Sequence, residues 1–275
     1  MNPHAKPQVS LAFLMRSLWT NRALVAQMIR REVTGRYKGS MMGLAWSFLN
    51  PVLMLVVYTF VFSVVFKARW AGGSESKTEF ALVLFSGLIL FNLFSECVNR
   101  APTLILGNVN YVKKVIFPLE ILPVISLGAA LFHWVISLGV WLIFYGIFYG
   151  VPHATVLLLP LIMLPLVLLS LGMGWLLASL GVYLRDVAQI VGVLMSVLMF
   201  LSPIFYPVSS LPADYQVIML INPLTLVIEQ TREVMMWGRA PDWIVWCKYL
   251  LCSGGVSWIC FVWFQKTRKG FADVL

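Results

Sequence analysis

Long apolar stretches alternate with short polar segments along most of this chain. The first long stretch, residues 43–66, follows a basic segment and contains an Asn50-Pro51 step. A helix of that length, at about 1.5 Å per residue, covers roughly 30 Å and crosses the hydrocarbon of a bilayer. The pattern predicts an all-α polytopic membrane protein with six transmembrane helices, at residues 43–66, 80–97, 119–149, 156–184, 187–206 and 243–264.

Residues 9–33 precede the first span and read as an amphipathic helix. Apolar residues recur there at i, i+3 and i+4, with arginines between them. A helix of this kind lies in the plane of the membrane interface. Its last turns hold Arg30, Arg31 and Glu32. The sequence leaves two interpretations open, a basic anchor or a docking surface for a cytoplasmic partner.

Residues 207–240, between the last two spans, are apolar only in pieces too short to cross a membrane. Pro207 precedes the first piece, and Pro223 separates it from the second. The pattern predicts two short re-entrant helices that dip into the outer leaflet or lie on it. Glu229 and Arg232 would then face water or each other.

Basic residues are distributed unevenly between the two sides of the predicted bundle. The segments 1–42, 98–118, 185–186 and 265–275 hold fourteen lysines and arginines, whereas the segments on the opposite side hold five. Positive charge collects on the cytoplasmic side of membrane proteins. The count therefore predicts that both termini are cytoplasmic. It also explains the net charge of +9 without a nucleic-acid partner.

Composition agrees with a polytopic membrane protein, and the sequence shows no catalytic centre. The chain is 60% hydrophobic and 11% charged, with a mean hydropathy of +0.88. No phosphate-binding loop, catalytic motif or metal-ligand spacing occurs in it. The few ionisable residues in the spans, such as Glu96 and Glu120, lie near span ends. We therefore expect no catalytic residue, metal or cofactor on this chain, and a partner that supplies the energy. His133 reads either as a relay or as a packing residue.

The loop after the second predicted span is open to a structural and a functional interpretation. The segment Asn108–Pro118 has an Asn that can cap a short helix and a Pro that ends it, with Tyr111 and Val115 on one face and Lys113 and Lys114 on another. It is either a helix that a motor protein grips or an ordinary connector.

Aromatic residues recur on one face of the first span, at Tyr58 and Phe62, with Trp46 near its start. Such rings stack on sugars, and they also pack against neighbouring helices. Small residues in the fourth span, Gly172, Gly174 and Ala178, predict close approach of another helix.

Five segments, in this order and spacing, carry a resemblance to a known family. They are RYKGSMMGLAWSFLNP (36–51), the Asn108–Pro118 loop, YLRD (183–186), SPIFYP (202–207) and INPLT…IEQTR (221–232). Together they resemble the permease subunits of ABC transporters that export polysaccharides, with O-antigen exporters the most similar and capsule and teichoic-acid exporters related.

The resemblance implies a homodimer of six-span subunits in the bacterial inner membrane, each a single transmembrane domain (1–275). Two ATP-binding cassette subunits would bind ATP and Mg²⁺, and an undecaprenyl-diphosphate-linked glycan would pass between the permease subunits, in contact with membrane lipids. Residues 9–33 would be the interface helix and 207–240 the outer gate. The motor would contact Asn108–Pro118 and the Arg185-Asp186 turn. The implied channel and glycan contacts are Trp46, Tyr58, Phe62, Met199 and Phe205.

Two rival functions remain at this stage. A small-molecule exporter of the same superfamily would share the architecture. A membrane enzyme that acts on lipid-linked sugars would need a cluster of acidic or histidine residues at one membrane face, and the sequence offers none.

Overall fold

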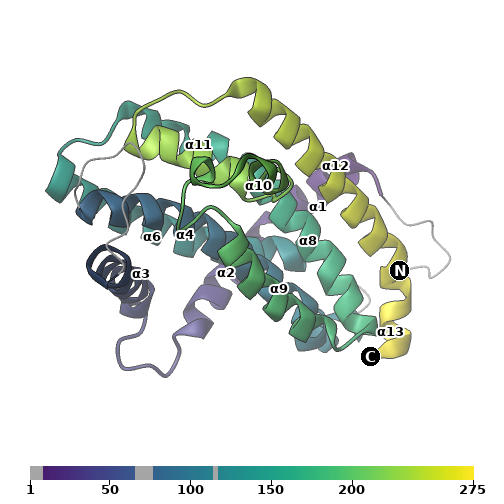
Figure 1. Ribbon diagram of the computed structural model, residues 1–275. Helices are drawn as coiled ribbons and strands as arrows, with labels where there is room; N and C mark the ends of the chain where they lie inside the picture. Colours follow the sequence, from purple (N-terminus) through teal and green to yellow (C-terminus); the bar gives the residue numbers. More distant parts are fainter. Residues whose placement is uncertain (1–8, 66–76, 114–116) are drawn as a thin grey trace.

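The computed structural model describes residues 9–65, 77–113 and 117–275, and within those ranges it is built from helices without a strand (Figure 1). The helices are α1 (Leu11–Thr20), α2 (Arg22–Arg36), α3 (Ala45–Tyr58), α4 (Lys77–Arg100), α5 (Val109–Lys113), α6 (Leu122–Tyr149), α7 (Leu159–Ile162), α8 (Leu164–Tyr183), α9 (Val187–Leu201), α10 (Ala213–Met219), α11 (Thr225–Met236), α12 (Trp243–Thr267) and α13 (Phe271–Val274). A π-helix, η1 (Thr59–Val65), continues α3.

Five helical segments are long and apolar enough to cross a membrane, namely Ala45–Phe62, Thr78–Thr103, Leu119–Tyr149, Ala154–Tyr183 and Trp243–Val274. They overlap five of the six expected spans. In place of the remaining one, expected at 187–206, the structure has α9, a helix of 15 residues that ends at Leu201. Ser202 is extended and precedes Pro203, and proline disfavours a helical residue before it. Six full-length spans are therefore not confirmed.

Helix α4 forms the centre of the bundle. It packs against α6, α8, α9 and α11, and 83% of its spanning window is buried. Its residues from Phe80 to Phe94 are almost all apolar, so that every face of the helix can be covered by protein. Trp141 of α6 also donates a hydrogen bond from Nε1 to the Leu82 carbonyl, at 3.1 Å.

The close helix approach predicted from small residues is confirmed on α8. A Cβ atom at Gly172 would lie 2.7 Å from the Cα atom of Ser257 on α12, and one at Gly174 would lie 3.1 Å from the Pro123 Cβ of α6. Ala178 is completely buried. Helices α6 and α12 therefore pack on α8 where its side chains are smallest.

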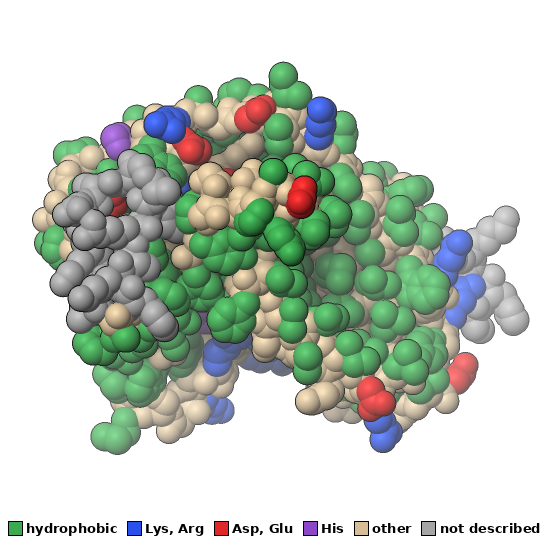
Figure 2. Space-filling view, in the orientation of Figure 1, with side chains coloured by type: hydrophobic (Ala, Val, Ile, Leu, Met, Phe, Trp, Pro, Cys, Tyr) green, Lys and Arg blue, Asp and Glu red, His purple; other side chains and the backbone are tan. Residues whose placement is uncertain are grey.

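Two helices leave wide apolar faces uncovered within the described chain. Only 11% of the α3 span is buried, and α3 lies at the edge of the bundle in Figure 1. Helix α9 exposes Ile190, Val193, Leu194, Val197 and Phe200. Figure 2 shows hydrophobic side chains over the middle of this face of the molecule, with charged side chains mainly near its rim.

Residues 207–240 contain two short helices, as the sequence predicts, but the two differ in burial. Helix α10 is mostly exposed, whereas α11 packs against α4 and belongs to the core. Eight of its residues, including Arg232, are buried. Of the two alternatives for Glu229 and Arg232, water or each other, the structure has the second, because Arg232 lies in the core and its Nη1 lies 3.2 Å from Glu229 Oε1.

Candidate functional site

Helix α2 is fastened to the end of α4 by charged side chains. Glu32 forms an ion pair with Arg100 at the end of α4. One turn later, Arg36 Nη2 lies 2.6 Å from Glu96 Oε1. Because Glu32 and Arg36 lie four residues apart on one helix face, both pairs hold the same side of α2 against α4. We call the region formed by α2, residues 96–113, the 183–186 turn and residues 265–275 the basic end of the bundle.

His133 of α6 also contacts the Arg36–Glu96 ion pair. His133 Nδ1 lies 3.1 Å from Glu96 Oε2, and His133 Nε2 lies 3.2 Å from the Tyr37 hydroxyl. Of the two interpretations of His133 from the sequence, the structure favours a packing residue whose polar atoms are satisfied. Sequence reasoning placed Glu96 near a span end but missed its partners, since Arg36 and His133 are far from it along the chain.

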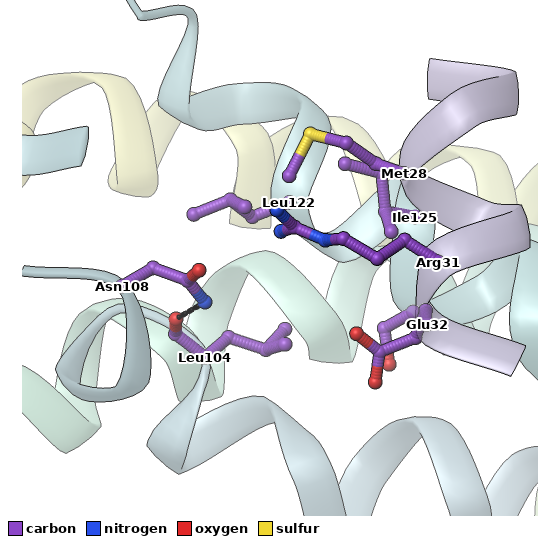
Figure 3. Close-up of a pocket in the computed structure, with 8 residues that line it drawn as sticks. Met28, Arg31, Glu32, Leu104, Asn108, Leu122 and Ile125 are labelled. Carbon is purple, nitrogen blue, oxygen red and sulfur yellow. Dashed lines mark hydrogen bonds between the residues drawn. The ribbon is translucent and has the colours of Figure 1, made fainter. Parts of the chain in front are cut away.

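A small cavity with polar and apolar lining lies between α2, the chain after α4 and the start of α6 (Figure 3). Its volume is about 20 Å³, and it is lined by Met28, Arg31, Glu32, Leu104, Asn108, Leu122, Ile125 and Ser126. In Figure 3 the Arg31 side chain extends from α2 across the cavity. Ser126 Oγ is buried without a hydrogen-bond partner among the described residues. This volume suits about one water molecule. The cavity is therefore too small to hold a nucleotide or a sugar.

Most of the described residues that are expected to contact a motor protein are exposed. Arg185 and Asp186 form an exposed turn between α8 and α9, and Lys113 is exposed at the end of α5. Lys114 and Val115 lie outside the described residues. Arg30 and Arg31 are exposed on α2, whereas Glu32 is half-buried.

Tyr111 is engaged within the protein. Its ring stacks on Phe117 with 4.3 Å between centroids, and its hydroxyl accepts a hydrogen bond from Arg31 Nη2 at 3.1 Å. Through this bond α2 and α5 contact each other directly. Asn108 Nδ2 donates to the Leu104 carbonyl at 2.8 Å, within a 3-10 turn (Leu106–Asn108) that directly precedes α5.

The aromatic residues of the first span meet a residue that follows α9. Phe62 stacks on Phe205 with 5.0 Å between ring centroids, and Tyr58 lies 6.2 Å from the same ring. Met199 is partly buried and packs against the main hydrophobic core, as Tyr58, Phe62 and Phe205 do. Trp46 lies twelve residues before Tyr58, about 18 Å along the helix, so it does not belong to the cluster.

The outer segment is anchored by a buried arginine. Arg232 is completely buried and donates from Nη2 to the Ile204 carbonyl at 2.8 Å and from Nε to the Val83 carbonyl at 3.3 Å. Its Nη1 lies 3.2 Å from Glu229 Oε1. Burial lowers the pKa of Arg232 to about 10, which leaves the guanidinium protonated at neutral pH. Arg232 thus joins α11, α4 and the chain after α9.

The two prolines of the outer segment have different surroundings. Pro223 lies between α10 and α11, and its carbonyl accepts a hydrogen bond from the Tyr249 hydroxyl of α12 at 2.5 Å. Pro207 is half-buried and directly precedes a short 3-10 turn. Pro223 therefore fixes the start of α11 to α12.

The chain is similar to known transport proteins over most of its length. A family model described as ABC-2 type transporter matches residues 23–236. The O-antigen export system permease protein RfbA of Myxococcus xanthus is 28% identical over 267 residues, which cover 94% of this chain and 98% of that protein. The protein of the same name from Klebsiella pneumoniae is 24% identical over 257 residues, 92% of this chain and 95% of that protein. The polysialic acid transport protein KpsM of Escherichia coli is 26% identical over 222 residues, 79% and 83% of the two chains.

Proposed function

The chain belongs to the ABC-2 type transporter family, and on that premise we propose that it is the permease subunit of an ATP-driven exporter of polysaccharide. The observation that carries the proposal is the similarity to an O-antigen export permease over 94% of this chain and 98% of the relative. The apolar helices of the structure suit a multi-pass membrane subunit. We propose O-antigen linked to undecaprenyl diphosphate as the cargo. We propose the bacterial inner membrane as the location of the protein. A capsule polysaccharide, a teichoic acid or a small molecule is the alternative.

A gene deletion tests this function. A strain without the protein should lose its surface polysaccharide and accumulate the lipid-linked polymer on the cytoplasmic side, and a plasmid copy should restore export. Normal surface polysaccharide in the deletion strain would contradict the proposal. Accumulation of a different lipid-linked glycan would favour one of the alternative cargoes.

We propose that two copies of the chain form the transport path between them. The exposed apolar faces of α3 and α9 support this arrangement. Gln189 and Ser196 lie two turns apart on α9, and both are exposed on this otherwise apolar helix. Polar side chains within a membrane normally face protein or water rather than lipid. A face that meets a second copy and a hydrated path explains them.

We propose that two ATP-binding cassette subunits, which bind ATP and Mg²⁺, contact the basic end of the bundle. The exposed Lys113, Arg185 and Asp186 support this assignment, as does the firm attachment of α2 to α4. Residues 207–240 would act as the outer gate, because Arg232 and Pro223 join them to α4 and α12.

The proposed topology predicts a labelling pattern. In a variant without native cysteines, Glu75→Cys should react with a membrane-impermeant maleimide in intact spheroplasts, because residues 67–79 are expected outside. Lys113→Cys serves as the matched control and should react only after the membrane is opened. The reverse pattern would overturn the orientation, which rests on the positive-inside count.

The aromatic cluster predicts a graded effect on transport. If Tyr58 and Phe62 contact the glycan, each single Ala variant should be mild, and the double variant should slow export while its membrane level stays normal. If the rings serve only packing with Phe205, the double variant should lose roughly 3–5 kcal/mol for each ring, as in soluble cores, and disappear from the membrane. Quantifying protein level beside surface glycan separates the two results. A stable double variant with full export would contradict the glycan contact.

A further inference from the structure

The C-terminal segment, residues 265–275, packs on the bundle although its sequence is polar and basic. After the apolar part of α12 the chain reads QKTRKG. A segment of this composition could extend into water. Instead Phe271 is completely buried, in a cluster with Trp175, Val182, Phe261 and Phe264. Tyr111 and Val112 of α5 pack against the same cluster. An apolar anchor of this size holds the segment in one place.

A buried ion pair provides a second anchor. Arg268 Nη1 lies 2.9 Å from Glu120 Oε2, and Glu120 is only 2% exposed. The other oxygen of the same carboxylate accepts a hydrogen bond from Ser17 Oγ of α1 at 2.9 Å. Glu120 therefore links the C-terminal segment, the start of α6 and the N-terminal helix through one carboxylate.

The segment contacts both elements that are proposed to meet the ATP-binding subunit. Helix α13 packs against both α5 and α8, and the Phe271 ring lies 6.0 Å from the ring of Tyr183 at the end of α8. The Tyr183 hydroxyl, two residues before Arg185, donates to the Thr267 carbonyl at 2.9 Å. A Cβ atom at Gly270 would lie 2.7 Å from that hydroxyl, so the glycine permits this close approach.

We propose that residues 265–275 form a strut that fixes α5 relative to the 183–186 turn, so that both move as one body when the ATP-binding subunit moves. Phe271 and Arg268 are its positioning residues. The inference rests on the proposed function, in which these two elements receive the motion. Without the strut, α5 and the 183–186 turn would move independently of each other. ATP hydrolysis would then continue with less transport.

The test measures ATP hydrolysed per polysaccharide exported, in the complete complex reconstituted in liposomes. Phe271→Ala and Arg268→Gln should assemble with the ATP-binding subunit and hydrolyse ATP, while export per assembled complex falls roughly tenfold, within the usual range of coupling between sites. Phe271→Leu and Arg268→Lys should restore coupling. Val274→Ala is the matched control, because Val274 is on the same short helix and is 51% exposed.

The possible results are distinct. Wild-type coupling in both Phe271→Ala and Arg268→Gln would overturn the strut, and so would a loss of assembled complex with an unchanged ratio, since that is the effect of a merely structural role. If Phe271→Ala does not fold, Arg268→Gln still decides, because it keeps the apolar anchor. A wild-type complex that exports no polysaccharide would refute the proposed function itself and the strut with it.

Discussion

Replacing Arg232 with methionine is expected to destabilise the protein strongly. Methionine fills much of the same volume but donates no hydrogen bond, so the carbonyls of Ile204 and Val83 lose a charged donor. A hydrogen bond from a charged group contributes about 1.5–3 kcal/mol, so losing both bonds should cost on the order of 3–6 kcal/mol. The chain after α9 would separate from α4, and the outer segment would lose its anchor.

The measurement is the thermal aggregation midpoint of the purified protein, together with its level in the membrane. Arg239→Met is the matched control, because the Arg239 side chain is 71% exposed and pairs with Glu233 at 3.4 Å. An exposed pair of this kind contributes about 0–1 kcal/mol. Arg232→Lys should be intermediate, since lysine keeps the charge but cannot reach two carbonyls in the same fork. An Arg232→Met protein as stable as the control would contradict the anchoring role.

The second large effect is expected at Gly181 of α8. A Cβ atom there would lie 2.0 Å from the Pro102 carbonyl oxygen and 2.7 Å from the Pro102 Cα. Both are backbone atoms, so no flexible side chain can move aside. Gly181→Ala should destabilise by roughly 1–3 kcal/mol through overpacking, and Gly181→Leu should prevent accumulation in the membrane.

Gly139→Ala on α6 is the control for this prediction. Nothing lies within 4 Å of a Cβ atom at Gly139, so alanine should be neutral or slightly stabilising in the helix. Membrane level and the unfolding midpoint measure both variants. Since Pro102 begins the segment that leads to α5, a tolerated Gly181→Ala should also displace α5 and lower export. Equal stability of Gly181→Ala and Gly139→Ala would show that α8 and residues 101–103 are not in close contact.

Hydropathy alone predicted the helical class and five of the spans, because a stretch long enough to cross a bilayer is visible without any knowledge of its neighbours. The same measure overestimated the length of the helix expected at 187–206, where the structure has α9. Its apolar residues continue to Tyr206, but the helix ends at Leu201 because Pro203 follows. Hydropathy counts apolar residues and does not register where the backbone leaves the helix.

The polar contacts could not be predicted because they join residues far apart in sequence. Arg36 and Glu96 are separated by 60 positions, and Arg232 and Val83 by 149. No local pattern marks such pairs. The contacts of Tyr111 with Arg31 and Phe117 were likewise not predicted, and its contact with a partner protein stays a prediction. Gly172 and Gly174 were predicted correctly because small residues in a spanning helix have a local physical reason.

The link from Glu120 to Arg268 has a consequence for the order in which the protein matures. The two residues are 148 positions apart, and at 5–20 residues per second the ribosome needs roughly 7 to 30 s to add the second after the first. During that interval the carboxylate of Glu120 has no guanidinium beside it. The nascent chain can insert its helices as they emerge, but the site at Glu120 closes only after translation reaches the last eight residues. A premature stop codon at Arg268 would therefore leave every spanning helix almost whole and this carboxylate permanently without its cation.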